Sequence, residues 1–264
     1  MLKGKVAVIT GGTRGIGFAT AKKFLENEAK VVLLGSKQET VEKALKELKH
    51  INSNYDVIGF YPNLSSKEEM NEIFKKIKEI YGRIDILINN AGFGDAGNFT
   101  ETSLDKEMDM IDLNIKAYHI LTKLFLKDFT KRNYGRILNV ASMAGLMPGP
   151  YMATYYATKN YIVSLSLAIY EELRKDNSNV KISIFCPGPV DTNFNNVADV
   201  KFNISSLTSD YASKIAIDGM FKNKLIIVPP NMKLNRFLIK IVPSKIILDI
   251  NSQIQEKRKS KEEN

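Results

Sequence analysis

Residues 5–19 read KVAVITGGTRGIGFA, a short apolar run that passes through clustered glycines into a helical pattern. The glycines have the spacing Gly-x-x-x-Gly-x-Gly, over Gly11, Gly15 and Gly17. Glycine lets backbone N–H groups approach a pyrophosphate closely, and the N-terminus of the following helix favours its negative charge. We therefore expect a strand, a phosphate-binding turn and a helix here.

The rest of the chain alternates in the same way. Apolar strands that are each followed by a helix favour a parallel sheet covered on both faces, and right-handed crossovers make that sheet doubly wound. The fold class is therefore α/β, with ligands expected outside the carboxyl ends of the strands. We expect strands at 6–10, 31–34, 56–60, 84–89, 136–140, 180–186 and 225–228, and helices at 15–27, 39–49, 65–81, 104–130, 154–175 and 209–221.

Composition narrows the class of protein. The 264 residues are 44% hydrophobic and 25% charged, which is ordinary for a globular chain. The one cysteine, Cys186, excludes an internal disulfide, and with only His50 and His119 beside it we expect no metal site. The N-terminus enters a strand at once without a signal-peptide pattern, and no apolar run is long enough to span a bilayer, so we expect a cytoplasmic protein.

The formal net charge of +9 is concentrated near the C-terminus. Residues 222–264 hold ten lysines and arginines against four acidic residues. No nucleic-acid-binding motif accompanies this charge, so we expect no nucleic-acid partner.

Tyr155 and Lys159 stand four residues apart in a predicted helix, with Ser142 thirteen residues upstream of Tyr155. Positions i and i+4 share one face of a helix. An ammonium beside a phenol favours the phenolate, so we expect the pKa of Tyr155 to lie below its ordinary value of about 10. A glycine-rich turn, a hydroxyl and an activated tyrosine together indicate coupled hydride and proton transfer.

These motifs, in this order and at these spacings, resemble the short-chain dehydrogenase/reductase family over about residues 4–228. The resemblance implies a single Rossmann-type domain of about seven strands over residues 1–264, with 229–264 a helical tail. It implies that Tyr155 is the general acid of the reduction and that Ser142 donates to the substrate oxygen. The matching segments are Thr10-Gly11-x-x-x-Gly15-x-Gly17, Asn89-Asn90-Ala91-Gly92, Asn114, Ser142, Tyr155-x-x-x-Lys159 and Pro187-Gly188.

The resemblance also implies the remaining contacts of a nicotinamide cofactor. Lys159 would bind the nicotinamide ribose and lower the pKa of Tyr155, while Asn114 would hold a water that links Lys159 to solvent. Asn63 departs from the family, which usually has aspartate there to contact the adenine amine. Transfer of the 4-pro-S hydride is implied as well. The implied cofactor contacts are Gly11, Thr13, Arg14, Gly15, Ile16, Gly17, Ser36, Lys37, Asn63, Leu64, Asn90, Ala91, Gly92, Tyr155, Lys159, Pro187, Gly188, Val190 and Thr192.

Charge favours NADP(H) over NAD(H). Residues 33–37 carry no carboxylate to hold a ribose 2′-hydroxyl, whereas Ser36 can donate to a 2′-phosphate and Lys37 and Arg14 can neutralise it. The family resemblance adds that NADP-preferring members usually have a basic residue at the position of Arg14. We expect that aspartate in place of Gly35 would move the preference toward NADH.

The expected substrate is a small apolar ketone, aldehyde or alcohol. The segments 93–99, 143–152 and 194–202 are predicted to line its pocket and offer Phe93, Met143, Leu146, Met147 and Phe194. Tyr151 is a further candidate for substrate contact, whereas Tyr156 and Cys186 are expected to pack in the core. Two other hypotheses remain open: a dinucleotide-sensing regulatory protein without turnover, and an epimerase or dehydratase.

Beyond Pro229 the sequence predicts a basic, amphipathic helical tail. Its apolar stripe comprises Leu234, Phe237, Leu238, Ile241 and Val242, and it is flanked by Lys233, Arg236, Lys240 and Lys245. The tail resembles that of the family subgroup with steroid and 3-ketoacyl-thioester reductases. The stripe is expected to cover the protein's own body, a second subunit of a homo-oligomer (dimer or tetramer), or an anionic membrane surface in a loose peripheral contact. The run 257–261 is expected to be a solvated end.

Overall fold

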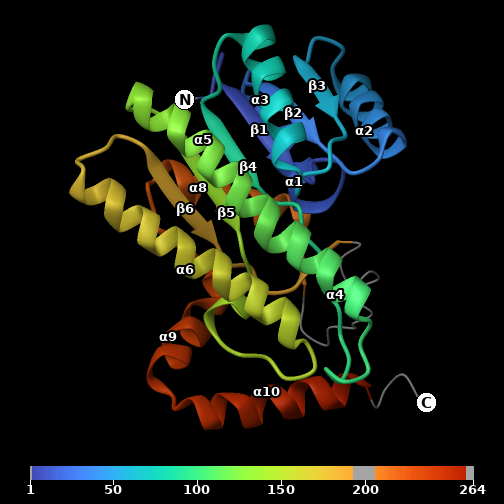
Figure 1. Ribbon diagram of the computed structural model, residues 1–264, viewed down its shortest axis with the longest axis vertical. Helices are drawn as coiled ribbons and strands as arrows, with labels where there is room; N and C mark the ends of the chain where they lie inside the picture. Colours follow the sequence, from blue (N-terminus) through green and yellow to red (C-terminus); the bar gives the residue numbers. More distant parts are fainter. Residues whose placement is uncertain (1, 193–205, 260–264) are drawn as a thin grey trace.

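The computed structural model describes residues 2–192 and 206–259. Within them seven strands form one sheet in the order β3-β2-β1-β4-β5-β6-β9, with every neighbouring pair parallel (Figure 1). This confirms the doubly wound α/β fold. The strands are β1 Val6–Thr10, β2 Lys30–Leu34, β3 Val57–Phe60, β4 Ile86–Asn89, β5 Arg136–Val140, β6 Lys181–Phe185 and β9 Ile226–Ile227.

Helices cover both faces of this sheet. One face packs against α1 (Gly15–Glu26), α2 (Gln38–Ile51) and α8 (Ser209–Phe221), and the other against α3 (Lys67–Tyr81), α5 (Tyr118–Arg132) and α6 (Ala153–Lys175). Because successive residues of a strand point to opposite faces, the residues of β1 divide between the two cores, and all five are buried. Double coverage is the reason that the strands read as unbroken apolar runs.

The order of the strands reverses between β1 and β4. From β1 the chain builds outward to β2 and β3, and from β4 it builds the other way to β5, β6 and β9. The loops that follow β1 and β4 therefore diverge at the carboxyl edge of the sheet and leave a crevice between them. The segments after β5 and β6 border the same edge.

The predicted single helix over 104–130 is wrong in one detail. The helix begins at Leu104 as α4 (Leu104–Ile111), widens into a π-helical segment η1 (Asp112–Ala117) and continues as α5. The buried amide of Asn114, on η1, bonds to groups outside the helix, and π-turns of this kind often occur at functional sites.

The tail folds into two further helices, α9 (Lys233–Ile241) and α10 (Ser244–Lys259), after a short 3-10 turn η3 (Pro230–Met232). In Figure 1 they lie at the end of the molecule away from the N-terminus, with α10 running across that end. A second 3-10 turn, η2 (Met143–Leu146), precedes α6, and the short strands β7 (Val190–Asp191) and β8 (Leu207–Thr208) pair in parallel. None of the helices in the described ranges is long and apolar enough to cross a bilayer.

Candidate active site

A cleft of about 1310 Å³ opens at the carboxyl ends of the strands and extends to the tail helices. Its walls come from the loops after β1, β2, β4, β5 and β6, from α6, and from α9 and α10. Of the residues expected to bind cofactor, those that line it are Gly11, Thr13, Arg14, Gly15, Ile16, Ser36, Lys37, Leu64, Asn90, Ala91, Gly92, Tyr155, Lys159, Pro187, Gly188, Val190 and Thr192. The catalytic candidate Ser142 lines it too.

The glycine-rich turn and the loop after β4 are locked together. The hydroxyl of Thr10 accepts hydrogen bonds from the N–H groups of Asn90 and Ala91, at 2.9 and 3.0 Å, and the Asn90 amide donates to the carbonyls of Thr10 and Gly11. A Cβ on Gly17 would lie 2.3 Å from the carbonyl oxygen of Gly11, so this position requires glycine for packing. Gly17 is not among the residues that line the cleft, and its role is to let α1 approach the turn.

The start of α1 fits a pyrophosphate. The helix begins at Gly15, which has a left-handed φ of 56°, and Arg14 precedes it in extended conformation. Gly15 and Ile16 both line the cleft, so the free N–H groups of the first helical turn are available there. A Cβ on Gly15 would lie 2.9 Å from the Thr192 side chain, so the turn and the loop after β6 also approach closely.

Arg14, in the turn after β1, and Ser36 and Lys37, after β2, are exposed and line the cleft. Gly35, by contrast, is buried, and a Cβ there would lie 2.6 Å from Cγ2 of Val41. Aspartate at position 35 is therefore a poor test of cofactor preference, because its side chain would displace Val41 before it reached a cofactor. Position 36 is the exposed neighbour that can carry a carboxylate into the cleft.

Asn63 caps the turn before α3. Its side-chain oxygen accepts hydrogen bonds from the N–H and the hydroxyl of Ser65, at 3.0 and 2.8 Å, as short polar side chains do in such turns. Leu64 lines the cleft, whereas Asn63 is not among the lining residues. The adenine contact expected of Asn63 stays a prediction.

Ser142, Tyr155 and Lys159 converge on the cleft from two segments. Tyr155 and Lys159 lie one turn apart on α6, and Ser142 precedes η2, where its Oγ accepts from the N–H of Ala144 at 3.1 Å. Tyr155 is hydrogen-bonded to Ser142. The ammonium of Lys159 donates to the carbonyl of Val140 at 3.3 Å and lies 5.9 Å from the centre of the Tyr155 ring.

The expected lowering of the pKa of Tyr155 is not found in this geometry. Burial raises the pKa of Tyr155 above its ordinary value, and the hydrogen bond to Ser142 opposes that rise only in part. Burial lowers the pKa of Lys159 to about 8. Both changes favour the neutral side chains, because water is excluded from both. At neutral pH Tyr155 therefore holds the proton that a reduction needs.

The lowered pKa of Lys159 predicts how stability changes with pH. The unfolded chain binds this proton up to an ordinary pKa of 10.5, and the folded chain only up to about 8. Between these values the unfolded state holds more protons, so raising the pH stabilises the folded state. From about pH 7 to about pH 9.5 we expect the free energy of unfolding of the wild type to rise by about 2 kcal/mol relative to Lys159→Met. Urea unfolding of both proteins at each pH measures this, and equal pH dependence would contradict it.

Asn114 is fully buried on the π-segment, and its amide joins three parts of the site. Its Nδ2 donates to the Phe93 carbonyl at 2.8 Å and to the Thr158 hydroxyl at 3.1 Å, and its Oδ1 accepts from the Phe93 N–H at 3.2 Å. The side chain thus fixes the loop after β4 against α6. The expected role of Asn114 in holding a water stays a prediction. Groups other than its side-chain amide would bind that water.

Because leucine at position 114 would leave the Phe93 backbone groups unpaired, Asn114→Leu should lower the free energy of unfolding by about 2 to 4 kcal/mol. Asn71→Leu is the matched control, because the Asn71 amide on α3 donates to the Lys67 carbonyl near the surface. We expect the control to change stability by less than about 1 kcal/mol. Thermal unfolding of the two variants tests the difference, and similar values would contradict this role of Asn114.

The part of the cleft that was expected to hold the substrate is apolar, and more segments of the chain line it than the three that were predicted. Phe93, Met143 and Met147 line it, whereas Leu146 packs in a neighbouring core cluster. Phe194, with the rest of 194–202, lies outside the described residues. Tyr156 packs in the core as expected and also lines the cleft, as does Met152 of the predicted segment 143–152. The tail adds lining residues that were not predicted for the pocket: Met232, Asn235, Leu238, Ile239, Val242, Ile247, Ile250, Asn251 and Ile254.

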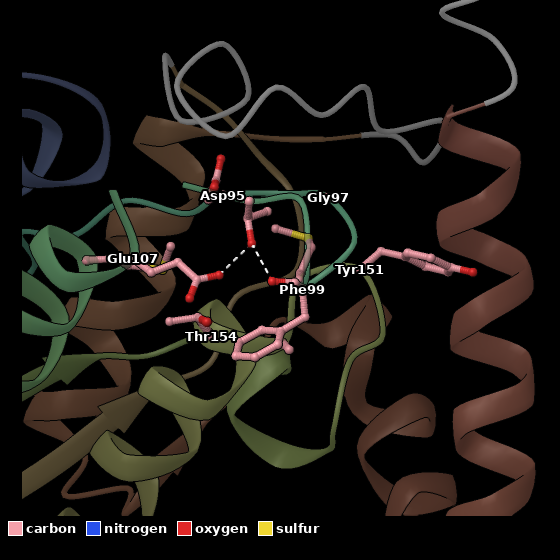
Figure 2. A pocket seen from close by; sticks show the side chains of 10 residues that line it. Asp95, Gly97, Phe99, Glu107, Tyr151 and Thr154 are labelled. Carbon is pink, nitrogen blue, oxygen red and sulfur yellow. Dashed lines mark hydrogen bonds between the residues drawn. The ribbon is translucent and has the colours of Figure 1, made fainter. Parts of the chain in front are cut away.

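A much smaller void lies beside the cleft, under the loop after β4. Figure 2 shows Phe99, Glu107 and Thr154 around it, and the hydroxyl of Thr102 bonds to Glu107 at 2.7 Å. Its volume of about 10 Å³ is enough for one water at most, so it is not a ligand site. Tyr151 extends away from this void toward α10 in Figure 2, and it does not line the main cleft.

A family model described as short chain dehydrogenase matches residues 5–201. The chain belongs to the short-chain dehydrogenase family. It is therefore an oxidoreductase of a family that uses NAD(P)(H). The family match covers the glycine-rich turn, Ser142, Tyr155 and Lys159.

The similar proteins agree on the family and differ in cofactor. The chain is 38% identical over 188 residues to a 3alpha-hydroxysteroid dehydrogenase of Mediterraneibacter gnavus, covering 71% of this chain and 74% of that protein. A short-chain dehydrogenase/reductase from Burkholderia phymatum, solved with NAD, has a TM-score of 0.82 at 24% identity and covers 90% of this chain and 93% of the other. A short-chain dehydrogenase from Sphingobium yanoikuyae, solved with NADPH, has a TM-score of 0.78 at 22% identity, covering 90% and 96%. At these identities the two structures show the fold alone.

Proposed function

We propose that this protein is an NADP(H)-dependent oxidoreductase that interconverts an apolar ketone or aldehyde and the corresponding alcohol. The observation that carries the proposal is that one cleft is lined by Ser142, Tyr155 and Lys159 and also by Arg14 and Ser36. The groups proposed to transfer a proton and those proposed to bind an anion thus line a single cavity of about 1310 Å³.

Three residues of the chain have separate roles in the proposed reduction. Tyr155 gives its proton to the carbonyl oxygen of the substrate. Its hydroxyl is protonated at neutral pH because burial raises its pKa. Ser142 donates a hydrogen bond to the same oxygen as negative charge builds on it. Lys159, buried beside the Tyr155 ring, stabilises the phenolate that remains. A bound nicotinamide supplies the hydride for the reduction or accepts it in the oxidation.

The proposed preference for NADP(H) rests on the charge after β1 and β2. Arg14, before α1, and Ser36 and Lys37, after β2, are exposed and line the cleft. A 2′-phosphate would receive charge-assisted hydrogen bonds from such a group, whereas a ribose 2′-hydroxyl would find no carboxylate in the segment 33–37.

The proposed substrate class is steroid-like or acyl-chain-like. The cleft is lined by Met143, Met147, Leu238 and Ile250 among others, whose apolar and partly flexible side chains suit a large apolar body. The similarity to a 3alpha-hydroxysteroid dehydrogenase supports this class.

The test is a panel of ketosteroids, 3-ketoacyl thioesters and short polar ketones, with NADPH consumption followed by absorbance. We expect turnover with the apolar members and a higher kcat/KM with NADPH than with NADH. Turnover confined to polar ketones would contradict the substrate class. Tight NADPH binding without turnover of any carbonyl would favour a dinucleotide-sensing protein instead.

A further inference from the structure

The outer face of α9 carries an apolar strip that the described part of the chain leaves uncovered. Leu234, Phe237 and Ile241 are 66, 59 and 61% exposed, and their spacing places them on one side of the helix. We call these three residues the α9 strip. The predicted stripe of the sequence therefore divides: Leu238 and Val242 turn into the cleft, and the α9 strip faces outward.

The tail is fastened to the body, so the exposure of the strip does not come from a detached helix. The amide of Asn251 on α10 is buried and donates to the Pro148 carbonyl at 2.9 Å. The Tyr151 hydroxyl donates to Glu256 at 2.8 Å, and Figure 2 shows this tyrosine reaching toward the helix. Pro148 and Tyr151 both lie in the segment between η2 and α6, which also contributes to the part of the cleft expected to hold the substrate.

The α9 strip continues into the mouth of the cleft. Leu238, the next apolar residue around α9, lines the cleft and is 42% exposed. On α10, Ile250 and Ile254 also line the cleft while remaining largely exposed. An apolar compound dissolved in a surface that covers the strip would reach the cleft through an apolar mouth.

The charge around the strip is basic. Lys233 is exposed at the start of α9 and Lys245 in the first turn of α10, and the sequence of α9 contains no acidic residue. Residues 229–264 hold eight lysines and arginines against four acidic residues. An apolar face bordered by basic residues is the pattern of helices that lie in the interface of an anionic bilayer.

We propose that the α9 strip docks the protein on an anionic membrane surface, with the mouth of the cleft turned toward the lipid. A second copy fits the strip less well, because a two-fold interface would bring the same patch against itself and place lysines near lysines without a carboxylate on α9 to pair with them. Anionic headgroups neutralise the lysines while the acyl region receives Leu234, Phe237 and Ile241. The proposal concerns the outer surface and does not depend on the proposed reaction.

Vesicle flotation of the full chain tests the proposal. We expect binding to vesicles of phosphatidylcholine mixed with phosphatidylglycerol, weaker binding at high salt, and little binding to pure phosphatidylcholine. Phe237→Ser/Ile241→Ser should lower the partition coefficient at least about tenfold, and Lys233→Glu/Lys245→Glu should lower it by a similar factor. None of these four residues lines the cleft, so turnover of a water-soluble ketone should be unchanged.

Matched controls separate the strip from general stickiness. Tyr61→Ser/Ile80→Ser removes two similarly exposed apolar side chains elsewhere, and Lys46→Glu/Lys75→Glu makes the same charge change on α2 and α3. Both controls should bind vesicles as the wild type does. The proposal is overturned if the wild type does not float, if the controls lose as much binding as the α9 variants, or if the α9 variants change only the solution mass, which would assign the strip to a second copy. The charge variant keeps the test decisive if the serine variant fails to fold.

Discussion

Replacing Tyr155 with phenylalanine should lower kcat for carbonyl reduction by about 10³-fold while leaving the dissociation constant of NADPH within a few-fold. The ring remains in place on α6, so the cleft keeps its shape, but the proton donor is lost. Burial holds the proton on this hydroxyl at neutral pH, and the neighbouring Lys159 is held to the Val140 carbonyl, so no second acid stands ready at the same point. Stopped-flow turnover and NADPH fluorescence measure the two quantities separately.

Tyr156→Phe is the matched control for this change. Tyr156 is the next residue on the same helix, is buried to the same degree and also lines the cleft. Loss of its hydroxyl should change kcat by no more than a few-fold. If Tyr155→Phe keeps more than about a tenth of the wild-type kcat, or if both variants lose activity equally, Tyr155 is not the general acid.

Arg14→Ser combined with Ser36→Asp should lower the ratio of kcat/KM for NADPH to that for NADH by about 10²-fold to 10³-fold. The first change removes a cation from the cleft wall, and the second places a carboxylate where it repels a 2′-phosphate and can accept from a 2′-hydroxyl. Both side chains are exposed and neither is in a crowded position, in contrast to Gly35. Initial rates with each cofactor at several concentrations measure the ratio.

The control for net charge is Lys75→Ser combined with Asn71→Asp, which makes the same change in charge on α3, outside the cleft. Its cofactor ratio should stay at the wild-type value. A wild-type preference for NADH, or a double variant at positions 14 and 36 whose ratio does not move, would overturn the proposed cofactor.

The fold follows from the sequence because the central strands are buried on both faces. The segment from Val6 to Ile9 is apolar throughout, and a parallel sheet between two layers of helices is the arrangement that buries such runs completely. The strand ends shifted by one or two residues, as at Ile86, where the predicted strand begins at position 84. The π-segment was not predicted, and the long-range bond that Asn114 makes there to Phe93 is not visible in local propensity.

Most residues expected to bind cofactor line one cleft, because glycines and charges act through short-range geometry that spacing encodes. The bonds of the Asn63 oxygen to Ser65, two residues away, were not predicted from the sequence. The pKa of Tyr155 was not predicted correctly: the i, i+4 spacing gives the neighbour, but the extent of burial, which dominates, depends on the whole cleft. For the tail, the sequence predicted only an amphipathic helix. Which side of α9 faces the cleft and which faces outward depends on how α9 and α10 are held against the body.

The most direct measurement follows the hydride itself. The wild-type protein is incubated with a ketosteroid and NADPH that carries deuterium at the 4-pro-S position, and the product alcohol is examined by mass spectrometry, with Tyr155→Phe run beside it. We expect one deuterium in the alcohol from the wild type and product at about a thousandth of that rate from the variant. An unlabelled alcohol would contradict only the expected 4-pro-S transfer. NADPH that binds but reduces no carbonyl of the panel, or equal product from the two proteins, would contradict the assignment of this cleft as an NADP(H)-dependent carbonyl-reducing site.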